Sequence, residues 1–160
     1  MKQQDKGLDH PHPLVGRIKS TGKKVVMHSC GAVSDFVAMM IEMGIDALNP
    51  VQVSAGGMNP RDLMRRFGKD IAFWGGGCDT QQVLPRGTPE EVYAHTKRNI
   101  EIFKPGGGFV FSQVHNILPD VPPENIIAMF QAAASLRNAA KGTSHDTSRL
   151  RACRHQPQTD

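Results

Sequence analysis

The sequence predicts an α/β fold with a parallel sheet, of the kind that closes as a (β/α)₈ TIM barrel. Four short apolar runs alternate with four helical patterns along the 160 residues, which is typical of parallel strands joined by crossover helices. The runs begin near residues 24, 45, 70 and 108. The separations between successive starts, about 21, 25 and 38 residues, are close to the roughly 30 residues per βα unit of an eightfold barrel. Four units make half a barrel; a flavodoxin-like open sheet is the alternative.

The predicted strands are brief, are flanked by glycine or proline, and contain residues that suit buried strands. They are Lys24–His28, Ile45–Pro50, Asp70–Trp74 and Gly108–Phe111.

The segments between the strands carry helix start and stop signals. A stripe of Val33, Phe36, Val37, Met40 and Ile41 has helical spacing, and Gly44 can end that helix. The other three helices begin at Asn59-Pro60, at a capping box Thr88-Pro89-Glu90-Glu91, and at Pro122-Pro123-Glu124. The helix that begins at Asn59-Pro60 ends at Gly68, and the one that begins at Pro122 runs to about Ala140.

The two ends of the chain differ from its middle. Residues 1–22 contain no full strand and are expected to be the remnant of a preceding helix or linker. Residues 23–140 hold the βα units. Residues 141–160 lack apolar periodicity and are expected to form a disordered tail.

Composition excludes several classes of function. The net charge of +4 is spread thinly, without a basic stripe or interleaved aromatic residues, so nucleic-acid binding is not expected. No apolar run approaches the roughly 20 residues of a membrane span, and a signal peptide is not apparent. Three cysteines form no disulfide framework. A cytoplasmic enzyme, or part of one, is the expectation.

Polar residues collect where the predicted strands end, which is where βα units place ligands and catalytic groups. The first strand is followed by His28-Ser29-Cys30 and the second by Gln52. The third is followed by Gly75-Gly76-Gly77-Cys78-Asp79-Thr80-Gln81, and the fourth by a segment with His115.

His28 and Cys30 suggest a metal site, because residues i and i+2 of an extended chain point to the same side. Zinc takes histidine nitrogen and cysteine sulfur, and a catalytic zinc has three protein ligands. Cys78 or His115 is the expected third. The alternative is a hydrogen-bonded strand-end histidine beside a small buried cysteine.

The remaining motifs have conformational interpretations. Neither glycine triplet matches a phosphate-binding loop; Gly75–Gly77 is expected to permit close approach of backbone or substrate, and Gly106–Gly108 to form a turn. Asp79 is expected to be a general base or, more commonly, a cap of the following turn. Five methionines are expected in or near the core: Met39, Met40, Met43, Met58 and Met64.

Several motifs in fixed order resemble the uroporphyrinogen decarboxylase superfamily, and the resemblance extends from about Gly22 to Ala133. They are His28–Gly31, Gly44–Gln52, Phe73–Gln81, Gly87–Val92, Val114–Ile117 and Pro122–Ile126. The family fold is a (β/α)₈ barrel, so the resemblance implies that this chain covers the C-terminal half, roughly the last four βα units.

The His-x-Cys motif resembles the family's zinc-dependent methyltransferases, which move methyl groups between corrinoid proteins, thiols and folate. This likeness implies one zinc ion on His28 and Cys30; register against Pro122–Ile126 makes His115 the third ligand, with Cys78 competing. It also implies a corrinoid-protein or small-molecule methyl donor. His115 and Asp79 would be catalytic, and the strand-exit residues Gln52, Gly76, Gly77 and Gln81 would contact the bound cofactor or substrate.

Two other readings remain open. In a uroporphyrinogen decarboxylase proper, with a tetrapyrrole substrate, His115 is the one catalytic position that carries over. A truncated, non-catalytic fragment is the second alternative. Because half a barrel exposes two strand edges and an apolar interior, a homodimer or complementation by an N-terminal half is expected.

Overall fold

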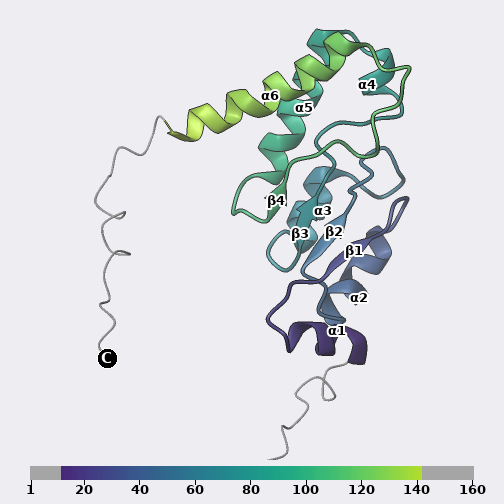
Figure 1. The fold of residues 1–160 in the computed structure, drawn as a ribbon, viewed down its shortest axis with the longest axis vertical. Helices are drawn as coiled ribbons and strands as arrows, with labels where there is room; N and C mark the ends of the chain where they lie inside the picture. The colour runs from purple at the N-terminus through teal and green to yellow at the C-terminus, as the bar shows by residue number, and fades with distance from the viewer. Residues whose placement is uncertain (1–11, 142–160) are drawn as a thin grey trace, which may run out of the picture.

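The computed structural model describes residues 12–141, in which four βα units follow one another along the chain (Figure 1). The strands are β1 (Val26–His28), β2 (Ala47–Asn49), β3 (Ala72–Trp74) and β4 (Phe109–Val110). The helices are α1 (Pro13–Lys19), the 3₁₀ turn η1 (Ser34–Phe36), α2 (Val37–Glu42), α3 (Pro60–Phe67), α4 (Val83–Arg86), α5 (Pro89–Phe103) and α6 (Pro123–Lys141).

The four strands form one parallel sheet in the order β1-β2-β3-β4. Val26 pairs with Ala47, Ala47 pairs with Ala72, and Phe73 pairs with Phe109. Each strand thus lies beside its successor, without the reversal of strand order that a flavodoxin-like sheet contains. All four predicted strands are confirmed, although each is shorter than its apolar run.

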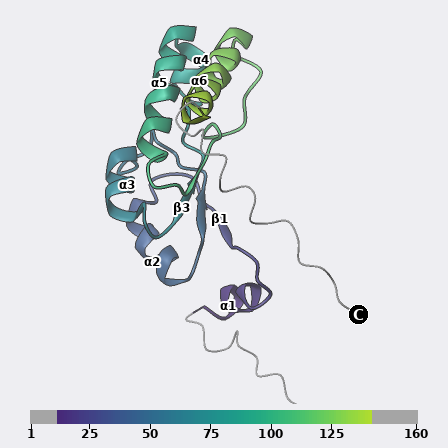
Figure 2. The same ribbon diagram turned by 90° about the vertical axis from the view of Figure 1, so that its left-hand side faces the viewer.

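The sheet buries one face against the helices. Residues in the middle of the strands, such as Leu48 and Phe73, point toward α2, α3 and α5, which lie together on one side of the sheet (Figure 2). Phe103 of α5 joins them, its ring centroid 5.6 Å from that of Phe73 and 5.1 Å from that of Phe109. Helices on the outer face of an in-order parallel sheet are the arrangement of a barrel segment.

The predicted helix starts are confirmed by their caps. The side chain of Asn59 accepts hydrogen bonds from the backbone of Arg61 and Asp62 at the start of α3. At the start of α5, Thr88 accepts from the backbone N–H of Glu91, whose carboxylate in turn accepts from the N–H of Thr88. Both helices have proline at the first position, where no backbone N–H is needed.

The helical stripe predicted from Val33 to Ile41 is only partly confirmed: Val37 and Met40 are buried, but Phe36 is 55% exposed. Met39, which was expected in or near the core with the other methionines, is 48% exposed. Phe36 lies in η1, whose tighter winding breaks the phase of the stripe before α2 begins at Val37. The prediction of a core position was therefore wrong for these two side chains.

A second core cluster lies away from the sheet, between α4, α5 and α6. It contains Cys78, Leu84, Val92, Val121, Ala128 and Met129. The short helix α4 is an addition to the predicted elements, whereas α1 lies within residues 1–22, where a helix or linker was expected. Residues 1–11 of the predicted N-terminal remnant and residues 142–160 of the predicted tail lie outside the described residues.

Candidate functional site at the strand ends

The sheet face opposite the helices carries a row of four side chains, one from the carboxyl end of each strand. His28 pairs with Asn49 and Trp74 pairs with Val110, and the β2–β3 register continued by one residue brings Asn49 beside Trp74. His28, Trp74 and Val110 are exposed. We call His28, Asn49, Trp74 and Val110 the inner row; in a closed barrel this face is the interior.

Hydrogen bonds tie three members of the inner row together. The Nδ2 atom of Asn49 donates to the backbone oxygen of Trp74 at 3.2 Å, which fixes the orientation of the amide. The Oδ1 atom of Asn49 therefore faces the Nδ1 atom of His28, at 3.0 Å. Since an amide oxygen only accepts, Nδ1 must carry the proton and the Nε2 lone pair is left for another partner.

Cys30 is exposed two residues beyond His28. The turn that carries it is held by Gln52, whose Oε1 atom accepts a hydrogen bond from the backbone N–H of Gly31 at 2.8 Å. In addition, Ser29 donates its backbone N–H to the oxygen of Asn49 at 2.8 Å. The segment after β1 is thus fixed by residues at the exit of β2.

The loop after β3 packs backbone against backbone, as the glycine triplet predicts. Gly75 and Gly77 donate their N–H groups to Val110 and Ser112, at 3.0 and 2.9 Å, so they extend the pairing with β4. A Cβ atom at Gly77 would lie 2.4 Å from the ring of Phe111, closer than real Cβ contacts. Glycine is required there because the neighbouring segment leaves no room for a side chain.

Asp79 turns the chain at the end of this loop. Its Oδ1 atom accepts from the backbone N–H of Gln81 at 2.9 Å, and the residue is buried. This is the turn-capping arrangement. Gln81 is exposed, and its Oε1 atom accepts from the hydroxyl of Ser54 at 3.1 Å. The geometry favours a positioning role for the Asp79 carboxylate over that of a general base.

Two α5 residues that sequence reasoning missed hold the loop from behind. His95 accepts the backbone N–H of Asp79 on Nε2 at 3.3 Å. Asn99, which is buried, donates Nδ2 to the backbone oxygen of Gly76 at 3.0 Å. Both residues are polar and lie four positions apart, so they share one face of α5. Their contact with the loop depends on how α5 packs behind it, which the sequence pattern does not show.

Cys78 lies apart from the inner row. Its side chain is fully buried in the second core cluster. Burial raises the pKa of this thiol to about 11, so it is held in the neutral form near pH 7. A zinc ligand must be a thiolate; the burial of Cys78 therefore favours a packing role.

His115 is exposed in the segment after β4. Among the described side chains, those of residues 12–136, no three of the types His, Cys, Asp and Glu are gathered as a metal-binding group. The structure therefore brings His28 and Cys30 to one strand end and does not assemble a full set of ligands with Cys78 and His115. The third ligand stays a prediction.

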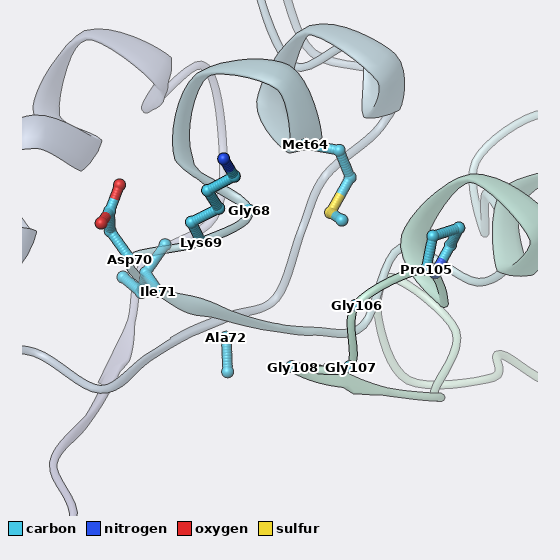
Figure 3. Close-up of a pocket in the computed structure, with 10 residues that line it drawn as sticks. All are labelled: Met64, Gly68, Lys69, Asp70, Ile71, Ala72, Pro105, Gly106, Gly107 and Gly108. Carbon is cyan, nitrogen blue, oxygen red and sulfur yellow. The ribbon is translucent and has the colours of Figure 1, made fainter.

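A hollow of about 700 Å³ lies at the other end of the sheet (Figure 3). It is lined by residues that precede β3 and β4, including Lys69, Asp70 and the turn Gly106–Gly108. All three glycines of that turn have positive φ, in accordance with the predicted turn. In βα folds the end at which strands begin is associated with stability and the end at which they leave with function.

An in-order parallel sheet, with helices on one face and polar residues at the strand exits, is consistent with part of a TIM barrel. The family model for uroporphyrinogen decarboxylase (URO-D) matches residues 9–136. The chain belongs to the uroporphyrinogen decarboxylase family.

The chain is also similar to a curated protein named uroporphyrinogen decarboxylase from Pseudoalteromonas translucida (strain TAC 125), with 37% identity over 68 residues. This match covers 42% of the chain and 18% of the relative, so the chain spans a small part of that protein. Within residues 12–141, the structure has no helix with the length and hydropathy needed to cross a bilayer.

Proposed function

We propose that this chain contributes the carboxyl ends of four strands to the active site of a zinc-dependent methyltransferase of the uroporphyrinogen decarboxylase family. The observation that carries the proposal is the pair formed by His28 and Cys30. The Nε2 lone pair of His28 is left free by the hydrogen bond to Asn49, and the Cys30 thiol is exposed two residues further on. We expect the intact protein to act in the cytoplasm.

The donor pair fits zinc, which binds histidine nitrogen and cysteine sulfur at about 2.0–2.3 Å. Metal-bound histidines commonly donate their second N–H to an oxygen acceptor, which orients the ring and raises its basicity. Asn49 supplies that acceptor at 3.0 Å. The third ligand is proposed to be His115, with Cys78 disfavoured by its burial.

A bound zinc ion would lower the pKa of the acceptor's thiol, giving a thiolate that attacks the methyl group at neutral pH while the bond between that methyl group and its donor breaks. The methyl donor is proposed to be a corrinoid protein or a small molecule. The chain's own residues hold this site in place: Gln52 fixes the turn of Cys30, and Gly76, Gly77 and Gln81 border the same edge of the sheet.

The decisive experiment is zinc analysis of the purified 160-residue chain, with His28→Ala and Cys30→Ala variants and Ser29→Ala as the matched control. We expect about one zinc per chain, retained by the control and lost by both ligand variants. A folded chain without zinc, or zinc unaffected by either substitution, contradicts the proposal. A Cys78→Ala variant that keeps its zinc would assign the third ligand elsewhere.

Uroporphyrinogen decarboxylation is the second candidate, favoured by the name of the Pseudoalteromonas relative. A decarboxylase binds a tetrapyrrole and protonates it, and His115 would be the proton donor carried on this chain. The assay is conversion of a tetrapyrrole substrate by the intact protein and by His115→Ala. Decarboxylation that falls at least tenfold in the variant, from a zinc-free protein, would favour this candidate over methyl transfer.

A partner chain is proposed to cover the exposed sheet face. β1 and β4 are the outer strands of the described sheet, and Val26, Trp74 and Val110 are 46%, 40% and 43% exposed on the face away from the helices. A second copy, or a polypeptide that supplies the N-terminal half of a barrel, would pair with those edges. Light scattering should give the mass of a dimer for the first partner; a monomer that gains mass only with an added N-terminal half indicates the second.

A further inference from the structure

His95 of α5 is surrounded by hydrogen-bond donors. Its Nε2 atom lies 3.3 Å from the backbone nitrogen of Asp79 and 3.0 Å from Nδ2 of Asn99. The Asn99 amide cannot be turned around, because the same Nδ2 group donates to the backbone oxygen of Gly76 at 3.0 Å. Two N–H groups therefore converge on Nε2, which must accept.

The opposite ring nitrogen is left with a conflict. A neutral imidazole that accepts on Nε2 carries its proton on Nδ1. The Nη2 atom of Arg98 lies only 3.2 Å from that Nδ1 atom, and a guanidinium is a donor without acceptor capacity. Two N–H donors thus face each other, and neither satisfies the other.

Protonation of His95 would make this conflict worse. Burial lowers the pKa of His95, the charge of Arg98 lowers it further, and the carboxylate of Asp79 works in the opposite direction with a smaller effect. The ring is therefore kept neutral at pH 7. Within this cluster, neither the Nδ1–H of His95 nor the Nη2 group of Arg98 finds an acceptor in the other, so an acceptor from outside can serve both.

A hollow on the outer surface lies next to these two donors. It has a volume of about 520 Å³, and its lining includes Arg86, Glu91, His95 and Arg98. A second hollow, of about 250 Å³, is lined by Arg61, His95, Arg98 and Asn99, so Arg98 stands between the two. The single carboxylate in the first lining, Glu91, already accepts from the backbone of Thr88 at 2.8 Å.

We propose that a small oxyanion, a phosphate or carboxylate group, binds between the Arg98 guanidinium and the Nδ1–H of His95, in the hollow between α4 and α5. An oxyanion offers several lone pairs, so it accepts from both donors at once. Arg86 adds positive charge at the rim of the same hollow. The site is on the helical side of the sheet, separate from the inner row.

The site also touches the loop after β3. His95 and Asn99 hold the backbone of Asp79 and Gly76 from behind. An anion that fixes the His95 ring therefore fixes the acceptor of the Asp79 N–H. This inference does not depend on the proposed methyl transfer, since it rests on groups that lie behind the loop.

The test is NMR of the ¹⁵N-labelled 160-residue chain, which reports the tautomer of His95 from its two ring nitrogens. We expect the Nδ1–H tautomer, and saturable shifts of the His95 signals on titration with inorganic phosphate or with acetate. Arg98→Ala should weaken that binding at least tenfold. Arg65→Ala is the matched control, because Arg65 is an exposed arginine paired with Asp62 on α3, and should bind as the wild type does.

Tighter binding of phosphate than acetate assigns the site to a phosphate group, and the reverse order assigns it to a carboxylate. Arg98 is exposed, so its removal leaves the core intact, and the backbone spectrum checks the fold. An Nε2–H tautomer overturns the proposal. Shifts that do not saturate, or that persist unchanged in Arg98→Ala, also overturn it.

Discussion

The Nδ1 atom of His28 lies 3.0 Å from the Oδ1 atom of Asn49 on the neighbouring strand. The orientation of that amide is set by a third strand, through the bond from Asn49 to the backbone oxygen of Trp74. A single asparagine therefore determines which ring nitrogen of His28 is free. This dependence makes Asn49 the residue whose substitution most directly tests the proposed metal site without removing a ligand.

We predict that Asn49→Ala weakens zinc binding by about 10–100-fold, the usual effect of losing the partner that orients a metal-bound histidine. Competition with a chromogenic chelator measures the affinity. Asn116→Ala changes an exposed asparagine in the segment after β4 and should leave the affinity unchanged. Equal affinities for wild type and Asn49→Ala would mean that the amide does not position the ring.

The buried thiol of Cys78 should make the protein less stable at alkaline pH. Its pKa is raised from 9.0 to about 11 in the folded chain, so the unfolded chain loses this proton first. The free energy of unfolding should be unaffected below pH 9 and fall by roughly 2–3 kcal/mol from this group between pH 9 and 11. Denaturant unfolding at a series of pH values measures the decline.

The comparison with Cys78→Ala isolates the contribution of this thiol to the alkaline decline. The variant creates a cavity and should be less stable at pH 7. Its stability should nevertheless decline less steeply above pH 9. Parallel curves for the two proteins would show that the thiol ionises as readily in the folded chain as in the unfolded one.

Acid should weaken the link between α1 and the sheet. Burial tends to raise the pKa of Asp46, but bonds from the Val25 backbone, Lys19 and Lys24 outweigh it, and the net pKa lies below 3.8. The stabilisation is complete above pH 3.8 and is lost as the pH falls through the lowered pKa. Asp46→Asn should flatten this acid limb, and denaturant unfolding of the variant and the wild type at a series of acid pH values makes the comparison.

Gly77→Ala should destabilise the fold by about 1–3 kcal/mol, because the new methyl group would lie 2.4 Å from the Phe111 ring. Gly56→Ala is the control: a Cβ there meets nothing within 4 Å. That variant should be neutral or slightly stabilised. Thermal unfolding of the two variants gives the comparison, and similar melting temperatures would show that Phe111 can move aside.

The sequence predicted the features that depend on short-range pattern. Apolar runs gave the four parallel strands, and local capping chemistry gave the starts of α3 and α5, because Asn59 and Thr88 act on backbone within three residues. Phe36 was misplaced because the helical period assumed a continuous α-helix, whereas the chain forms a 3₁₀ turn there. Periodicity does not reveal a local change of winding.

The site was predicted less completely. His28 and Cys30 emerged from i, i+2 spacing, which an extended chain fixes. The roles of His95 and Asn99 depend on how α5 docks behind the loop after β3, and that contact spans 16 to 23 residues. The burial of Cys78 depends likewise on α6, which follows it by more than 40 residues. Such long-range packing has no signature in a single sequence.

The alternation along each strand separates two kinds of residue. Leu48 and Phe73 hold the helices, while their immediate neighbours Asn49 and Trp74 belong to the inner row. Each unit thus presents one side chain to the interior that can be exchanged with little effect on the fold beneath it. Substitutions in the inner row can therefore change the chemistry of the site one strand at a time, because the side chains that pack against the helices occupy the adjacent positions of each strand.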